Sequence, residues 1–154
     1  MTDGELSAVV ERRDSQELSQ ALTGLHAADI AAFMTSLRPE ESDFAFSTLP
    51  DAIAAVVLDE LGLESKLSLL GDSAAARISS LVEHLEIDDA AELVSDLPGE
   101  QSAEVLANLN ETRASEIQTT LGYAENTAGR LMTTTYVSLD QSMPARQAVS
   151  HVRA

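Results

Sequence analysis

The sequence predicts an all-α fold: a right-handed superhelix, or solenoid, built from short helical hairpins. Three observations predict it. Leucines recur every twelve residues between Leu25 and Leu121, and Pro, Gly or Asn often follows them. Hydrophobic residues make up 44% of the 154 residues. Aromatic residues make up only 3%, so the core must be aliphatic, which favours short helices over a β-sandwich.

The repeat defines eight units of twelve residues between positions 26 and 121. The eighth position of a unit is always apolar: Phe33, Ala45, Val57, Leu69, Leu81, Leu93, Val105 and Ile117. The ninth position is also apolar except at Gln118. Together with the fifth and twelfth positions, these residues share one face of a helix. Each unit is therefore predicted to be one helix of two to three turns.

Helix boundaries are predicted near positions 38, 50, 62, 86, 98, 110 and 122, where Pro, Gly or Asn stands at or close to most unit starts. Two more helices are expected over residues 5–13 and 16–25, with Asp14 or Ser15 as the cap between them. Ser73 replaces the leucine of the fourth unit, and a local bend is predicted at residues 71–73. Helices this short are not stable alone, so neighbouring units must stack.

The last thirty residues follow a different pattern. Residues 136–139 form a short strand-like run, and Pro144 opens a helix through Val152. A lone strand and helix cannot bury their apolar side chains, so a further structure is expected downstream. The predicted division is a helical domain over residues 1–123 and a connector with the beginning of a second domain over residues 124–154.

The net charge of −17 limits the possible partners. An acidic surface repels nucleic-acid phosphates and anionic lipids and attracts metal ions or basic partners. Cysteine is absent, which excludes disulfides and thiolate metal sites. The chain has neither an apolar run long enough for a membrane span nor a basic region typical of a signal peptide, so it is predicted to be soluble.

One stretch without Lys or Arg, between Arg77 and Arg113, carries the candidate metal ligands. Asp88, Glu92 and Asp96 recur at a spacing of four residues, which places three carboxylates on one helix face. Like charges at this spacing destabilise a helix by about 0.2–0.5 kcal/mol per pair. A bound cation would relieve that cost, and Mg²⁺ prefers oxygen ligands. An ordinary solvated acidic face is the alternative.

No pattern in the chain predicts catalysis. His26, His84 and His151 lie far apart and follow no metal-ligand spacing. His26 is expected to start a helix, and His84 is expected to be exposed near a helix end. The plentiful Ser and Thr residues accompany no nucleophile-elbow or P-loop motif. The chain is therefore predicted not to be an enzyme.

Four segments together resemble the cytosolic N-terminal domain of MgtE-type magnesium transporters. They are LHAADIAAFM at 25–34, LPDAIAAVVLDEL at 49–61, EIDDAAELVSDL at 86–97 and, most specifically, AENTAGRLMTTTYVSL at 124–139. In that family the last motif leads from the helical domain into the first CBS domain, so residues 124–154 would begin a truncated CBS domain. Glu92 is the best match to the acid that the family has at the interface between this domain and the CBS domains. Val56 stands where the family often has a Glu.

The resemblance implies a magnesium sensor on the cytoplasmic side of the inner membrane. Mg²⁺ would bridge acids of this domain to the CBS domains of the same protein and close the membrane pore domain, with a possible homodimer in the full-length protein. Binding of Mg²⁺ by this chain alone is expected to be weak. The alternative is an interaction module similar to the helical domains of the flagellar rotor-switch protein.

Overall fold

The computed structural model describes residues 3–71, 73–124, 127–132 and 137–153. All regular secondary structure in these ranges is helical. The helices are α1 (Asp3–Glu11), α2 (Ser15–Thr23), α3 (Ala27–Ser36), α4 (Pro39–Ser47), α5 (Asp51–Glu60), α6 (Leu63–Gly71), α7 (Ala75–Val82), α8 (Ile87–Asp96), α9 (Gly99–Asn108), α10 (Glu111–Leu121), α11 (Ala128–Leu131) and α12 (Ala145–Val152). The predicted all-α fold and short helices are confirmed.

The helix starts lie where the sequence places its caps and breakers. Asp14 caps α2 by accepting a hydrogen bond from the Glu17 backbone N–H at 3.0 Å. Asn110 caps α10 in the same way, accepting from the Arg113 N–H at 2.9 Å. His26 is the residue before α3, as predicted, and Pro50 and Pro98 precede α5 and α9.

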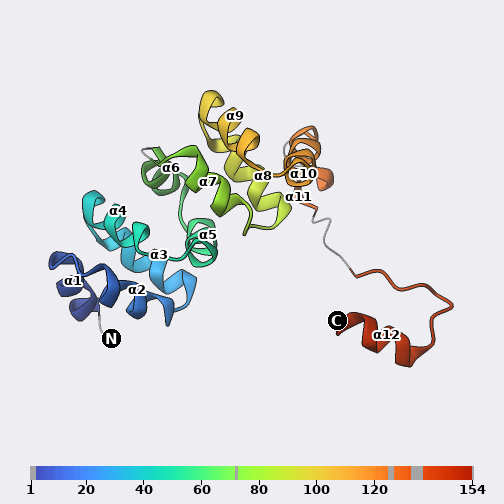
Figure 1. Cartoon of the computed structure of the whole chain (residues 1–154), viewed down its shortest axis with the longest axis horizontal. Helices are drawn as coiled ribbons and strands as arrows, with labels where there is room; N and C mark the ends of the chain where they lie inside the picture. The colour runs from blue at the N-terminus through green and yellow to red at the C-terminus, as the bar shows by residue number, and fades with distance from the viewer. Residues whose placement is uncertain (1–2, 72, 125–126, 133–136, 154) are drawn as a thin grey trace.

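Successive helices stack along the long axis of the molecule (Figure 1). Most helices pack on the next helix but one: α3 packs on α5, α5 on α7, α7 on α9, and α8 on α10. Consecutive helices such as α3 and α4, or α8 and α9, also touch. This is the arrangement expected when neighbouring hairpins bury each other's apolar stripes. The right-handedness of the superhelix stays a prediction. The bend predicted at residues 71–73 includes Asp72, which lies outside the described residues, and α6 ends at Gly71.

The eighth position of every unit is buried, from Phe33 to Ile117, so one apolar core runs through the stack. Two of the recurring leucines, Leu97 and Leu109, are also buried, with 6% and 8% of their surface exposed. Leu85 differs, because it is only partly buried at the edge of this core. It lies in the corner between α7 and α8, where its backbone carbonyl accepts a hydrogen bond from the Arg113 guanidinium.

Long polar side chains join units that are far apart in the sequence. Arg77 on α7 donates to the Leu49 carbonyl at 3.2 Å and forms an ion pair with Asp51 at 2.7 Å. Arg113 on α10 donates to the carbonyls of Val82 and Leu85. Both arginines occupy the fourth position of their unit and reach the end of an earlier helix, whose last carbonyls lack helical partners. The repeat therefore sets cross-links as well as the core.

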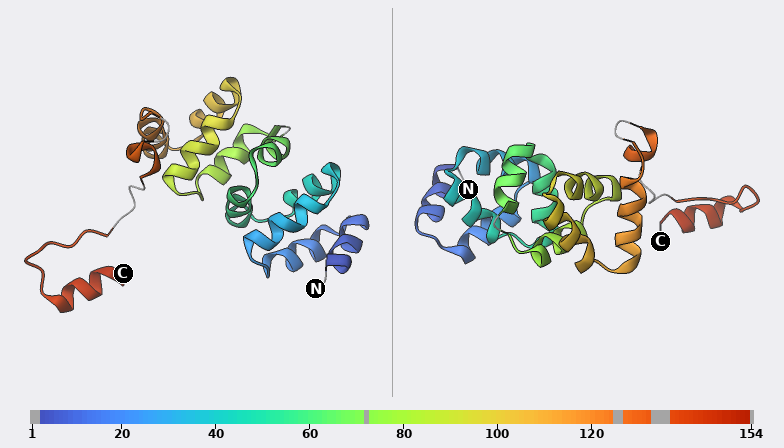
Figure 2. Two further views of the ribbon diagram at one scale, coloured as in Figure 1. Left: turned by 180° about the vertical axis from the view of Figure 1, so that it is seen from behind. Right: turned by 90° about the horizontal axis from the view of Figure 1, so that it is seen from above.

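The segment after α10 is built differently. The strand expected at residues 136–139 is not confirmed: residues 137–139 have no regular secondary structure, and Tyr136 lies outside the described residues. A strand needs a neighbour to satisfy its backbone hydrogen bonds, and the described part of this segment supplies none. The helix after Pro144 is present as α12, and it stands apart from the stacked helices in all views (Figures 1 and 2).

Candidate functional site

The three predicted metal-ligating residues line one cavity. Asp88, Glu92 and Asp96 all project from α8 into an open space of about 380 Å³. The remaining lining residues are Asp89, Ser95, Arg130 and Leu131. One wall of this cavity is therefore the acidic face of α8, and the other comes from α11. The helical spacing of four residues brings the acids to the same side, as the sequence predicted.

The environments of these carboxylates differ along the helix. Asp88 and Asp89 lie in the first turn of α8, where the helix dipole favours negative charge. Asp96 is the last residue of α8, where the dipole opposes its charge, and the last turn contains no basic residue. Glu92 is exposed between them. A cation in this cavity would be most valuable near Asp96, since nothing else in the helix compensates its charge.

Asp88 has an unpartnered oxygen. Its Oδ1 atom is buried and accepts no hydrogen bond. Buried carboxylate oxygens normally have a partner, because leaving one without a hydrogen bond has a desolvation cost. This atom fits a ligand that supplies positive charge, and a carboxylate lining is the donor type that Mg²⁺ prefers.

Asp89 carries the perturbed carboxyl group of the site. Burial raises its pKa above the ordinary range, and the nearby charges of Asp59, Asp88 and Glu92 raise it further, while Lys66 opposes the shift. Asp89 is the fourth residue of its unit. The same position in the flanking units holds Arg77, Gln101 and Arg113, which all donate to backbone carbonyls of earlier helices.

Between Arg77 and Gln101, a carboxylate therefore stands at the position where the flanking units have a hydrogen-bond donor. Asp89 cannot donate when ionised. Instead it extends the negative charge of α8 toward Asp59, near the end of α5. The acidic surface thus spans the units of α5 and α8 rather than one helix. Lys66, which opposes the pKa shift of Asp89, is the one lysine of the chain.

The acids alone do not form a complete coordination site. Within the described residues, no group of three or more His, Asp or Glu side chains is close enough to hold a metal ion. Residues four apart on a straight helix point the same way but stay separated along the axis. The arrangement can attract a hydrated divalent cation and contact it with one or two carboxylates. Chemistry on a substrate would need other groups.

The sequence did not reveal Arg130 as part of this site. Its Nη2 atom donates to the Ala91 carbonyl on α8 at 3.3 Å, across 39 positions of the chain. The available signal was the AGRLMT motif, in which Arg130 is the first basic residue after Arg113. Val56, the position where the resembling family often has a Glu, lies exposed on α5.

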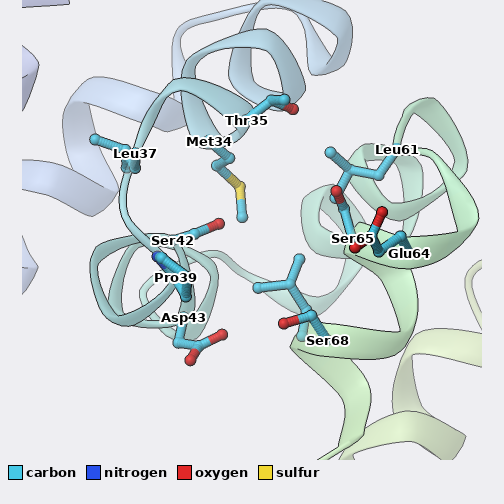
Figure 3. A pocket seen from close by; sticks show the side chains of 11 residues that line it. Met34, Thr35, Leu37, Pro39, Ser42, Asp43, Leu61, Glu64, Ser65 and Ser68 are labelled. Atoms are coloured by element: carbon cyan, nitrogen blue, oxygen red, sulfur yellow. The ribbon is translucent and has the colours of Figure 1, made fainter.

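A second cavity, of about 210 Å³, lies between α3, α4 and α6 (Figure 3). Met34 projects into it from α3, and Ser42, Ser65 and Ser68 lie around it with their hydroxyl groups. Its charged lining residues, Asp43 and Glu64, are both acidic. Among the described residues, none of the unpartnered buried side-chain atoms lines it, so it is a weaker candidate than the α8 cavity.

Comparison with known proteins identifies the class of the domain. The family described as "MgtE intracellular N domain" matches residues 25–126, which contain all eight repeat units and the α8 acids. The chain belongs to this family. The assignment favours the transporter prediction over the rotor-switch alternative.

The relatives are longer proteins. The chain is 28% identical to the magnesium transporter MgtE of Thermus thermophilus over 151 positions. The match covers 96% of this chain and 34% of that protein. The cytosolic domain of the Mg²⁺ channel MgtE, solved in complex with ATP, matches with a TM-score of 0.88 at 25% identity, over 99% of this chain and 62% of that one. The soluble part of a magnesium transporter gives a TM-score of 0.84 at 22% identity, over 98% and 60%.

These likenesses support the fold of the whole described chain. Among the residues that the structure describes, no helix is both long and apolar enough to cross a bilayer. The chain spans about a third of the transporter and three fifths of the solved cytosolic structures.

Proposed function

We propose that this chain is the magnesium-sensing regulatory domain of a magnesium transporter, located on the cytoplasmic side of the inner membrane. The observation that carries the proposal is the α8 cavity, with Asp88, Glu92 and Asp96 on one wall and an unpartnered Asp88 oxygen. Membership of the MgtE N domain family supplies the ion, since the relatives are magnesium transporters.

In the proposed mechanism, α8 provides half of each magnesium site. A divalent ion needs about six oxygen ligands, and one helix face offers carboxylates from one side only. The other half would come from acids of CBS domains that follow in the same protein. Mg²⁺ would draw the two halves together, because each acidic surface repels the other until a cation lies between them. This closure would hold the membrane pore domain shut when Mg²⁺ is plentiful.

The exposed apolar residues of the C-terminal segment support a partner on that side. Val137, Leu139, Val149 and Val152 are each at least 45% exposed. Four apolar side chains within one short segment are more than the scattered exposure of an ordinary surface. We assign them to the beginning of the first CBS domain, which residues 124–154 would enter. A homodimer would form through the parts that follow.

The half-site also explains why binding to residues 1–154 alone should be weak. A ligand stabilises a fold by RT ln(1 + [L]/Kd), which is about 0.4 kcal/mol when its concentration equals Kd. With few protein ligands and several retained waters, Kd for the isolated chain is expected to be high. Thermal stability of residues 1–154 should therefore change little with Mg²⁺.

The test uses the transporter-length protein that contains this chain. Limited proteolysis across residues 124–133 is followed during a magnesium titration, for the parent and for a Glu92→Ala/Asp96→Ala variant. We expect the parent to become protected cooperatively and the variant to need more Mg²⁺. A Glu100→Ala/Glu104→Ala variant is the matched control, because it removes two charges from α9, outside the cavity. If the parent and the α8 variant become protected at the same Mg²⁺ concentration, these acids are only a solvated surface and do not bind the ion.

A further inference from the structure

Arg130 occupies an unusual place for a basic residue. It lines the same cavity as Asp88, Glu92 and Asp96, and in the described part of the cavity it is the basic member. Its Nη2 atom is bonded to the Ala91 carbonyl, yet its Nη1 atom is buried without a hydrogen-bond partner. None of the ion pairs among the described residues involves Arg130. The guanidinium thus faces an acidic wall without a fixed contact to a carboxylate.

Local structure fixes this arginine in place. Arg130 belongs to the single helical turn of α11, whose N–H groups at Arg130 and Leu131 donate to the Thr127 carbonyl. The preceding residue, Gly129, lies against the ring of Tyr123. A Cβ atom at Gly129 would meet the Tyr123 Cδ1 atom at 2.7 Å, well inside van der Waals contact. The absence of a side chain at 129 therefore lets α11 close on the end of α10 and presents Arg130 to α8.

From this placement we infer that Arg130 is a tethered cation that competes with Mg²⁺ for the acids of α8. The inference rests on the proposed function, because it concerns the regulation of the same half-site. With α11 docked, the guanidinium supplies part of the positive charge that the acids require. A divalent ion that enters the cavity meets a like charge, which lowers its affinity.

The competition also works in reverse, because the coupling between two binding events is reciprocal. If docked α11 weakens Mg²⁺ binding, bound Mg²⁺ must weaken the docking of α11 by the same factor. The hydrogen bond between Arg130 and Ala91 links α8 to the connector. Occupancy of the metal site would therefore change the docking of α11, which joins the helical stack to the C-terminal residues.

The experiment compares magnesium titrations of residues 1–154 by NMR, at constant ionic strength, for the parent and Arg130→Met. Amide shifts of α8 report binding. We expect Arg130→Met to lower Kd about three- to ten-fold, the range given by one positive charge acting on a divalent ion through partly screened solvent. Arg146→Met on α12 is the control: it removes the same charge away from the cavity and should leave Kd within about two-fold. Arg130→Lys, which keeps the charge, should stay near the parent.

Amide hydrogen exchange provides the second readout. In the parent, Mg²⁺ should accelerate exchange at residues 128–132 while the core amides of α8 and α10 keep their protection. An unchanged Kd in Arg130→Met, or slower exchange at residues 128–132 with Mg²⁺, overturns the inference. The same holds if Arg146→Met lowers Kd as much as Arg130→Met, since net charge alone would then explain the change.

Failure of the proposed function would look different. If shifts of α8 are absent or unaltered in an Asp88→Asn/Glu92→Gln/Asp96→Asn background, the acids do not bind Mg²⁺ and both proposals fall. If that background abolishes the shifts and Arg130→Met leaves Kd at the parent value, the half-site stands and the competition by Arg130 does not.

Discussion

The helical stack and the C-terminal segment are governed by different physics. In the stack, which runs from α1 to α10, the eighth position of every repeat unit is buried. The apolar stripes of neighbouring helices cover each other. In the segment from residue 127 onward, the described residues include no buried side chain. The stack supplies its own core, whereas α11 is held by a few polar and steric contacts with the stack, and α12 stands apart from it.

The difference teaches where function can be built. The apolar residues buried between the helices of the stack are constrained by packing, so substituting them lowers the stability of the fold. The α8 acids and Arg130 lie where stack and segment meet, and they are free of that constraint. A sensing site placed there can respond to ions without unfolding the domain, because the contacts that would change are few.

The largest expected contrast comes from apolar deletions in the two regions. Leu81→Ala removes a fully buried side chain and should lower the free energy of unfolding by about 2–5 kcal/mol. Val149→Ala, on exposed α12, should change it by less than about 0.5 kcal/mol. Urea denaturation followed by circular dichroism measures both. Similar losses in the two variants would show that the segment shares the core of the stack.

The next contrast concerns arginines. Arg113→Met removes hydrogen bonds from a charged donor to the carbonyls of Val82 and Leu85, and should cost about 1.5–3 kcal/mol. Arg12→Met removes only the exposed ion pair with Glu17 and should cost about 0–1 kcal/mol. The same denaturation experiment distinguishes them. If the two substitutions cost the same, the fourth-position donors are not structural links.

A smaller effect is expected at the junction. Gly129→Ala places a methyl group against the Tyr123 ring and should speed hydrogen exchange in α11, with less than about 0.5 kcal/mol change in global stability. Tyr123→Ala in the same background should restore slower exchange. Alanine is the better helix former, so slower exchange in Gly129→Ala itself would contradict the steric account.

The smallest effect is the pH dependence at Asp89. The pKa of this carboxyl is raised in the folded state, so the fold binds its proton more tightly than the unfolded chain does. Ionised Asp89 therefore costs stability above its folded-state pKa, and that cost disappears as the pH falls toward the unfolded value. Asp89→Asn should melt higher than the parent at pH 7, and the two should converge near pH 4. A constant difference across this range would contradict the assignment.

Most of the helical stack and part of the candidate site could be predicted from the sequence. A period of twelve residues repeats the same helical face, so the sequence alone places positions such as Leu81, Leu93 and Val105 in the core. The spacing of Asp88, Glu92 and Asp96 placed them on one side of α8 for the same reason. Periodicity could also have revealed the links of Arg77 to Leu49 and of Arg113 to Leu85, which both span 28 residues.

Other features could not be read from local pattern. The contact of Arg130 with Ala91 depends on how α11 folds back over α10, and no repeat leads to it. The partial exposure of Leu85 depends on the corner between two helices rather than on its place in the stripe. The expected strand at residues 136–139 depends on a partner, which a pattern of side chains cannot supply.

The central claim is that the acids of α8 receive the magnesium ion. The most direct test titrates residues 1–154 with Mn²⁺, a paramagnetic substitute for Mg²⁺, and records the loss of NMR amide signals along the chain. Broadening should begin at residues 88–96 and 130–131 and should be reversed by excess Mg²⁺. Broadening centred on other acids, such as Glu40 and Glu41 in α4 or Glu100 and Glu104 in α9, would contradict the claim.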